Sequence, residues 1–130
     1  MKTILIISGG IEAADAAKRA KEMGLCVVVS DADRNAPGFA FADHRLTADV
    51  YAAEETADEA EKFHNELRPI DGVICVAADA PLTVAAVAER LGLPGITTKT
   101  AKLASDKLAM KRCFATAGVK IPWFAPVADP

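Results

Sequence analysis

Unbroken runs of apolar residues, many of them β-branched, recur along the chain and end at glycine or polar residues. Runs without a polar residue at every second position are typical of strands in a parallel sheet that is covered on both faces. The pattern therefore predicts buried strands at residues 3–7, 25–29 and 72–76, with shorter strands at 44–47 and 92–96.

Between these runs, apolar residues recur at every third or fourth position, which places them on one face of a helix. Gly24 and Gly118 follow two of these segments as stop signals. A last apolar segment, 119–127, has strand propensity but no later strand with which to pair. We expect helices at residues 11–23, 54–67, 80–91 and 106–117.

Strands and helices thus alternate, which implies right-handed crossovers between parallel strands. We predict a doubly wound α/β fold, with a mostly parallel sheet of about five strands and helices on both faces. The length of 130 residues, with 52% hydrophobic residues, suits a single core.

Charge and hydropathy exclude several kinds of partner. The net charge is -3 and lysines and arginines form no cluster, so neither nucleic acid nor an anionic membrane is expected. No apolar run approaches the roughly 20 residues of a membrane span. Residues 1–3 lead directly into a strand-like run, without the cleavage site of a signal peptide. We expect a cytoplasmic protein.

Cysteines and histidines form no catalytic pattern. Cys26, Cys75 and Cys113 are odd in number and lack the spacing of metal ligands, so we interpret them as reduced core residues. His44 and His64 have no serine, cysteine or acid at the spacing of a triad or metal site. We expect both to be structural or exposed, with His64 at the edge of the core. No carboxylate cluster offers a magnesium site.

Ligands of open parallel sheets bind outside the carboxyl ends of the strands. Gly9 and Gly10 permit close backbone approach there, and the following helix offers free N–H groups to a phosphate or carboxylate. Glu12 in the first turn of that helix opposes an anion, and a plain tight turn is the alternative reading. The loops at this edge are residues 8–10, 31–38 and 77–79.

Two aspartates lie in the same loops. Asp31 either binds a ligand hydroxyl or amine, or solvates its loop and caps the turn. Asp79 precedes Ala80-Pro81 at a predicted helix start, which suits a helix N-cap better than a ligand group.

A dinucleotide-binding fingerprint requires glycines in the order G-x-G-x-x-G and an acid about 20 residues later. Ser8, Gly10, Ala13 and Asp31 occupy the corresponding positions, so the match is only partial. This counts against the cofactor domain of a dehydrogenase.

The region 92–122 carries a series of motifs in a fixed order. With the Gly9-Gly10 turn and the Asp31 loop, they resemble the amino-terminal region of ATP-grasp enzymes, such as biotin carboxylase, glycinamide ribonucleotide synthetase, the carboxylating enzymes of purine synthesis and the large subunit of carbamoyl phosphate synthetase. The resemblance covers nearly the whole chain. The motifs are Gly92-Leu93-Pro94-Gly95, Ser105-Asp106-Lys107, Met110-Lys111, Ala117-Gly118-Val119 and Ile121-Pro122.

This resemblance implies a division into a Rossmann-like domain, residues 1–104, and the start of an ATP-grasp region, residues 105–130. Members of the family use ATP and magnesium to form an acyl phosphate from a carboxylate, which an amine or another nucleophile then attacks. By similarity, Lys107 reaches toward ATP, and Asp106 is interpreted as a helix N-cap. The residues expected to contribute to the substrate pocket are Gly9, Gly10, Asp31 and Asp79.

The chain departs from the family pattern in two respects. The first loop reads Ser8-Gly9-Gly10 where several relatives have a glycine on each side of one residue. The adenine-clamping strands, the phosphate lid and the magnesium-binding acids are expected beyond Pro130, so the chain alone is expected to be inactive. The expected partner is a small carboxylate, with a possible homodimer. The alternative function is a stand-alone nucleotide-binding Rossmann module without catalysis.

Overall fold

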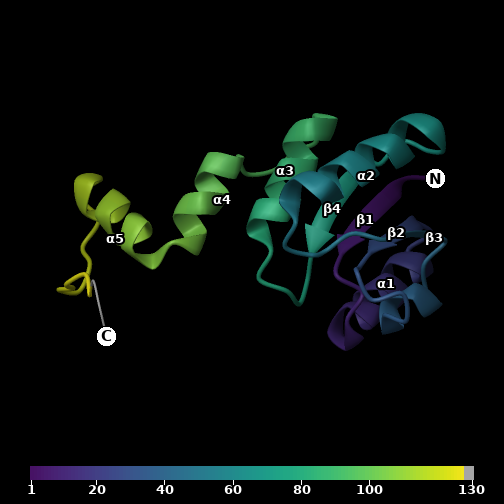
Figure 1. The fold of residues 1–130 in the computed structure, drawn as a ribbon, viewed down its shortest axis with the longest axis horizontal. Helices are drawn as coiled ribbons and strands as arrows, with labels where there is room; N and C mark the ends of the chain where they lie inside the picture. The colour runs from purple at the N-terminus through teal and green to yellow at the C-terminus, as the bar shows by residue number, and fades with distance from the viewer. Residues whose placement is uncertain (128–130) are drawn as a thin grey trace.

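A four-stranded parallel sheet forms the centre of the computed structural model, which describes residues 1–127 (Figure 1). The spatial order of the strands is β3-β2-β1-β4, the beginning of the Rossmann order. Every pairing is parallel, so the predicted α/β class is confirmed. The strands are β1 (Thr3–Ile7), β2 (Cys26–Ser30), β3 (His44–Leu46) and β4 (Gly72–Cys75).

Helices cover both faces of the sheet, and each face has its own core. The helix α1 (Ile11–Glu22) and the short 3₁₀ helix η1 (Pro37–Ala40) pack on one face, around Ile6, Val27 and Val29. The helices α2 (Ala53–Glu66) and α3 (Pro81–Leu91) pack on the other, around Leu5, Ile7 and Val28. The side chains of one strand alternate between these cores, which is why the central strands read as unbroken apolar runs.

Arg90 links α3 to α2. Its guanidinium lies within salt-bridge distance of three carboxylates on α2, those of Glu54, Asp58 and Glu61. The hydrogen bond to Asp58, followed by that to Glu61, raises the pKa of Arg90 above its usual value.

Across residues 1–127 no helix has the length and hydropathy that a bilayer-spanning segment requires.

The predicted fifth strand at residues 92–96 does not form, so the sheet has four strands in the described part of the chain instead of about five. Gly92 ends α3 in the left-handed conformation, with φ of 64°, and the N–H of Leu93 donates to the Ala88 carbonyl at 2.8 Å. This closure satisfies the end of the helix, and the described residues that follow it pair with no strand of the sheet. Instead, a helix that the pattern did not predict, α4 (Thr98–Ser105), follows and is capped by Thr97.

The last helix, α5 (Lys107–Thr116), begins as predicted, because the Asp106 carboxylate accepts hydrogen bonds from the N–H groups of Leu108 and Ala109, each at 2.9 Å. None of its residues is buried. Figure 1 shows α4 and α5 extending away from the sheet, with α5 farther out. The residues that follow α5, up to Val127, form neither helix nor strand, and Trp123 is 89% exposed.

The three cysteines are free, but they do not share one environment. Cys26 is buried and Cys75 is half-buried, as strand positions predict. Cys113 is exposed, so its prediction as a core residue is wrong. The reason is that α5, on which it lies, does not pack against the sheet.

Candidate functional site

Asp31 connects two loops at the carboxyl edge of the sheet. Its Oδ2 accepts a hydrogen bond from the N–H of Gly9 at 2.7 Å, and its Oδ1 accepts one from the N–H of Asp33 at 2.9 Å. From the sequence, Asp31 was expected either to bind a ligand or to cap its own turn. The second bond shows that it caps the turn. The first bond joins residues 22 positions apart and fixes the loop after β2 against the turn after β1.

The same loop covers Gly9. The N–H of Gly38 donates to the Gly9 carbonyl at 2.7 Å. A Cβ on Gly38 would lie 2.9 Å from the Gly9 Cα, and one on Gly9 would lie 2.9 Å from the Ala36 Cβ. Only glycine permits this approach. Gly9 is buried as a result, so its place in the site is beneath the loop.

Gly10 is more accessible than Gly9. It is half-buried, and a Cβ there would meet only the Ser8 Oγ at 3.5 Å and the Glu12 Oε2 at 3.8 Å. Gly10 is the N-cap of α1, without a side-chain cap bond. The first N–H groups of α1 therefore remain suited to an anion, although Glu12 lies close by.

Ser8 holds an unusual backbone conformation at the end of β1. Its φ is 76°, the one positive φ of a non-glycine residue in the described chain. Two hydrogen bonds hold it: its N–H donates to the Ser30 carbonyl at 2.9 Å, and its Oγ accepts from the Gly10 N–H at 3.3 Å. Strain of this kind often accompanies functional loops, and the sequence pattern gave no signal of it.

Asp79 lies at the end of the neighbouring strand. Its prediction as a helix N-cap is wrong, because Ala80 is the N-cap of α3 and no side chain caps that end. Pro81 has no N–H to offer at the first helical position, which reduces the need for a cap. Asp79 is exposed and lines a hollow of about 420 Å³ with Cys75, Ala78 and Ile96.

Gly10 and Asp79 flank the point at which the strand order reverses. Ile7 pairs with Cys75, so the loops after β1 and β4 leave the sheet side by side. The chain passes from β3, at one edge, to β4 on the other side of β1. Such a switch point opens the crevice in which doubly wound sheets bind ligands.

Lys107 lies far from this edge, at the start of α5. It lines a hollow of about 310 Å³ with Lys111, beside an apolar wall made by Leu108 and residues 124–127. The Lys111 Nζ lies 5.4 Å from the centroid of the Phe124 ring, a cation–π contact that holds the last segment against α5. The hollow thus combines two lysine side chains with an apolar wall. The sequence pattern gives no signal that Lys111 lines this hollow.

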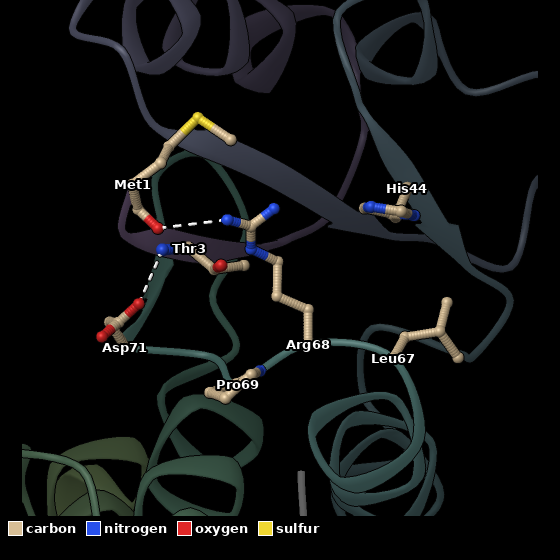
Figure 2. Close-up of a pocket in the computed structure, with 7 residues that line it drawn as sticks. All are labelled: Met1, Thr3, His44, Leu67, Arg68, Pro69 and Asp71. Atoms are coloured by element: carbon tan, nitrogen blue, oxygen red, sulfur yellow. Dashed lines mark hydrogen bonds between the residues drawn. The ribbon is translucent and has the colours of Figure 1, made fainter.

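A larger hollow, of about 610 Å³, lies at the opposite edge of the sheet and contains none of the predicted site residues. Figure 2 shows its lining. The N–H of Thr3 donates to Asp71 Oδ2 at 2.7 Å, and Arg68 Nη2 donates to the Met1 carbonyl at 3.3 Å. These bonds fasten the start of β1 to the loop before β4, and we interpret the hollow as structural.

Both histidines also have structural contacts. The His44 ring packs edge-on against Phe63, with 5.0 Å between the centroids. The Nδ1 of His64 accepts a hydrogen bond from the Ile70 N–H at 3.1 Å. Within residues 1–127, no three His, Cys, Asp or Glu side chains are arranged to hold a metal ion.

The model of the ATP-grasp N-terminal domain matches residues 17–95, more than half of the chain. The chain belongs to the family of ATP-grasp N-terminal domains. The resemblance stated from the sequence is thereby confirmed. Comparison with curated protein sequences gives no match.

Solved structures of ligases contain the same fold as this ATP-grasp N-terminal domain. Phosphoribosylglycinamide synthetase from Anaerococcus prevotii superposes with a TM-score of 0.79 at 22% identity, over 90% of this chain and 29% of that one. L-amino acid ligase from Bacillus licheniformis gives 0.73 at 22% identity, over 94% and 32%. N5-carboxyaminoimidazole ribonucleotide synthetase from Thermotoga maritima gives 0.73 at 23% identity, over 99% and 34%. The chain therefore spans about a third of the length of these proteins.

Proposed function

We propose that the chain is the substrate-binding amino-terminal domain of an ATP-dependent ligase that joins a small carboxylate to an amine or thiol through an acyl phosphate. The observation that carries the proposal is the family match across residues 17–95, followed by the Asp106-capped helix with Lys107 at its start. The structural neighbours that are named as synthetases or ligases support it.

In this proposal the substrate lies at the switch point between β1 and β4. Gly10 and the first N–H groups of α1 would receive the carboxylate, and Asp79 would contribute a polar group from the neighbouring loop. Gly9 and Asp31 would shape the pocket, because the Asp31 carboxylate fixes the covering loop through the Gly9 N–H.

Lys107 is the proposed ATP contact. Bound ATP would supply the phosphoryl group that activates the carboxylate. The Lys107 ammonium would lie against phosphate oxygens, and the apolar wall of the hollow that it lines would exclude water from the base. Lysine is unfavourable at a helix start because of the helix dipole, so local helix stability does not explain its position. We assign magnesium to an ATP-grasp segment other than these residues.

The proposal also implies that residues 105–130 begin the ATP-grasp region, and that the ligase acts in the cytoplasm, with a homodimer as one possible assembly. Phosphoryl transfer depends on positioned metal ions and a phosphate cradle. The 130-residue chain alone is therefore expected to release no ADP from ATP and magnesium.

The test compares the purified chain with the product of the gene that encodes it, extended past Pro130. We expect magnesium-dependent ADP release that requires a carboxylate from the extended protein and none from the 130-residue chain. ADP release by the short chain, free of contaminants, would contradict the assignment. A gene without an ATP-grasp segment would favour the stand-alone nucleotide-binding module.

The carboxylate site can be tested separately on the short chain. Acetate should shift the amide resonances of residues 10–13, and Gly10→Val should abolish those shifts by filling the space above the turn. Shifts that gather elsewhere would contradict the site without affecting the family assignment.

A further inference from the structure

The loop between β2 and β3 lines another hollow, of about 300 Å³, which the proposed function does not use. Two arginines line it, Arg34 from the loop and Arg45 from β3, together with Asn35 and residues of η1. No acidic side chain contributes to its lining. The hollow is therefore positively charged on a chain whose net charge is -3.

Arg45 is held in place by its neighbours. Its Nη2 donates to the Phe39 carbonyl at 3.3 Å, and its guanidinium carbon lies 5.2 Å from the centroid of the Phe39 ring. Phe39 is itself buried in the core beneath α1. A guanidinium that stacks on a packed ring loses less freedom when it binds a ligand. Its other N–H groups remain as donors.

Neither arginine has a carboxylate partner within 4.0 Å in the part of the chain that the structure describes, whereas Arg19 and Arg90 each have at least one. The acids of the same loop hold backbone groups instead. Asp31 accepts from Gly9 and Asp33, and Asp33 Oδ1 accepts from the Asn35 N–H at 2.9 Å. Neither guanidinium of the hollow is therefore directly ion-paired with an acid of the loop.

We propose that this hollow binds a phosphate-class oxyanion, either inorganic phosphate or the phosphate group of a monoester. Two guanidinium forks from different segments suit a tetrahedral anion with several acceptor oxygens. The ligand would join the loop to β3. Because the same loop covers Gly9 through Ala36 and Gly38, an anion held there stabilises the cover over the glycine turn.

The test is an NMR titration of the ¹⁵N-labelled 130-residue chain with inorganic phosphate at constant ionic strength. We expect saturable shifts in the backbone amides of residues 34–40 and in the side chains of Arg34 and Arg45. Arg34→Gln and Arg45→Gln should each raise the dissociation constant about tenfold or more. Arg112→Gln, which removes an exposed arginine of α5, is the matched control and should leave it unchanged.

Two further arms make the result decisive. A titration with methyl phosphate distinguishes the two candidate ligands. If methyl phosphate binds more tightly than inorganic phosphate, the ligand is a phosphate monoester; if it binds more weakly, the ligand is the free ion. Arg45→Lys keeps a positive charge near Phe39 but removes the planar guanidinium. Weaker phosphate binding by a folded Arg45→Lys variant therefore supports recognition by the guanidinium and not by charge alone. Shifts that are linear with concentration, equal for chloride, or unaffected by both glutamine variants would overturn the proposal. Shifts confined to residues 10–13 would also overturn it, while leaving the carboxylate site intact.

Discussion

The N–H of Gly38 donates to the carbonyl of Gly9 at 2.7 Å, and each glycine occupies a place where a Cβ would lie 2.9 Å from a neighbouring atom. The two residues come from loops that follow different strands. Their contact brings the loop after β2 over the turn after β1. The shape of the candidate site therefore depends on the absence of two side chains.

Gly38→Ala should lower the free energy of unfolding by about 1–3 kcal/mol, because the new methyl group would meet the Gly9 backbone, which cannot move aside as a side chain can. Urea denaturation measures the change. Gly72→Ala is the matched control, since a Cβ at Gly72 meets nothing within 4 Å. Equal stability of both variants would show that the loop does not rest on Gly9.

Asp31→Ala should lower the free energy of unfolding by about 1–3 kcal/mol, because it leaves the buried N–H of Gly9 without its acceptor. Faster hydrogen exchange at the Gly9 amide should accompany the loss. Asp33→Ala removes an acceptor from the exposed Asn35, where water can replace it, and should change stability by less than about 0.5 kcal/mol. If Asp31 served only a substrate, its removal would leave stability and exchange unchanged.

Ser8 provides a test of stored backbone strain. A β-branched residue is poorly tolerated at φ of 76°, so Ser8→Val should be less stable than Ser8→Gly by at least about 1 kcal/mol. Ser8→Gly itself should lie within about 1 kcal/mol of the parent chain, because relief of strain offsets the lost Oγ bond to Gly10. Thermal unfolding of the three proteins gives the order, and a valine variant as stable as the glycine variant would refute the strain.

The acid stability of the domain should depend on Asp43. Its carboxylate accepts hydrogen bonds from the Lys21 ammonium and from the Val27 N–H, which hold its pKa below the usual 3.8. A carboxyl group whose pKa falls on folding stabilises the protein above its unfolded pKa, and that contribution is lost as the pH falls through the lowered folded pKa.

Asp43→Asn should therefore lose stability near neutral pH and show a shallower further loss below about pH 4 than the parent chain. Urea unfolding between about pH 7 and pH 3 measures both. Asp15→Asn, at an exposed position of α1, is the control. An unchanged acid slope in the Asp43 variant would contradict the prediction.

Lys107→Ala, in the complete ligase, should weaken ATP binding or turnover by roughly ten- to a hundredfold, as expected for one lost charge-assisted bond. The fold and the affinity for the carboxylate should remain nearly unchanged. Steady-state kinetics with ATP varied gives the answer, with the exposed Lys99→Ala as control. A variant with the parent ATP dependence would show that Lys107 is only a surface residue.

Local sequence patterns predicted the parts of the fold that local forces determine. The unbroken apolar runs at β1 and β2 arise because both faces of those strands are buried, and Asp106 caps α5 within three residues. The strand predicted at residues 92–96 was wrong. The prediction depended on Ile96, an apolar residue that follows a glycine- and proline-containing turn, as the first residues of a strand often do. The left-handed Gly92 instead closes α3, and the short α4 carried too few apolar residues to be recognised.

The candidate site was predictable only in part. The rule for parallel sheets located the loops, but the bond between Gly9 and Asp31 spans 22 positions, and no local pattern could choose between the two roles of Asp31. The closeness of Gly9 and Gly38 likewise appears only once β1 and β2 are paired. Arg34 and Arg45 each look like isolated surface residues until η1 folds between them.

Because α5 and the segment after it lie away from the sheet, the intrinsic tryptophan fluorescence of the chain reports on the surroundings of that segment. Trp123 is the one tryptophan in the sequence and is 89% exposed, next to the Phe124 ring on which Lys111 rests. Its fluorescence should therefore peak near the wavelength of an indole in water. A blue shift on extension of the chain, or on addition of another molecule, would report directly that this arm has been covered.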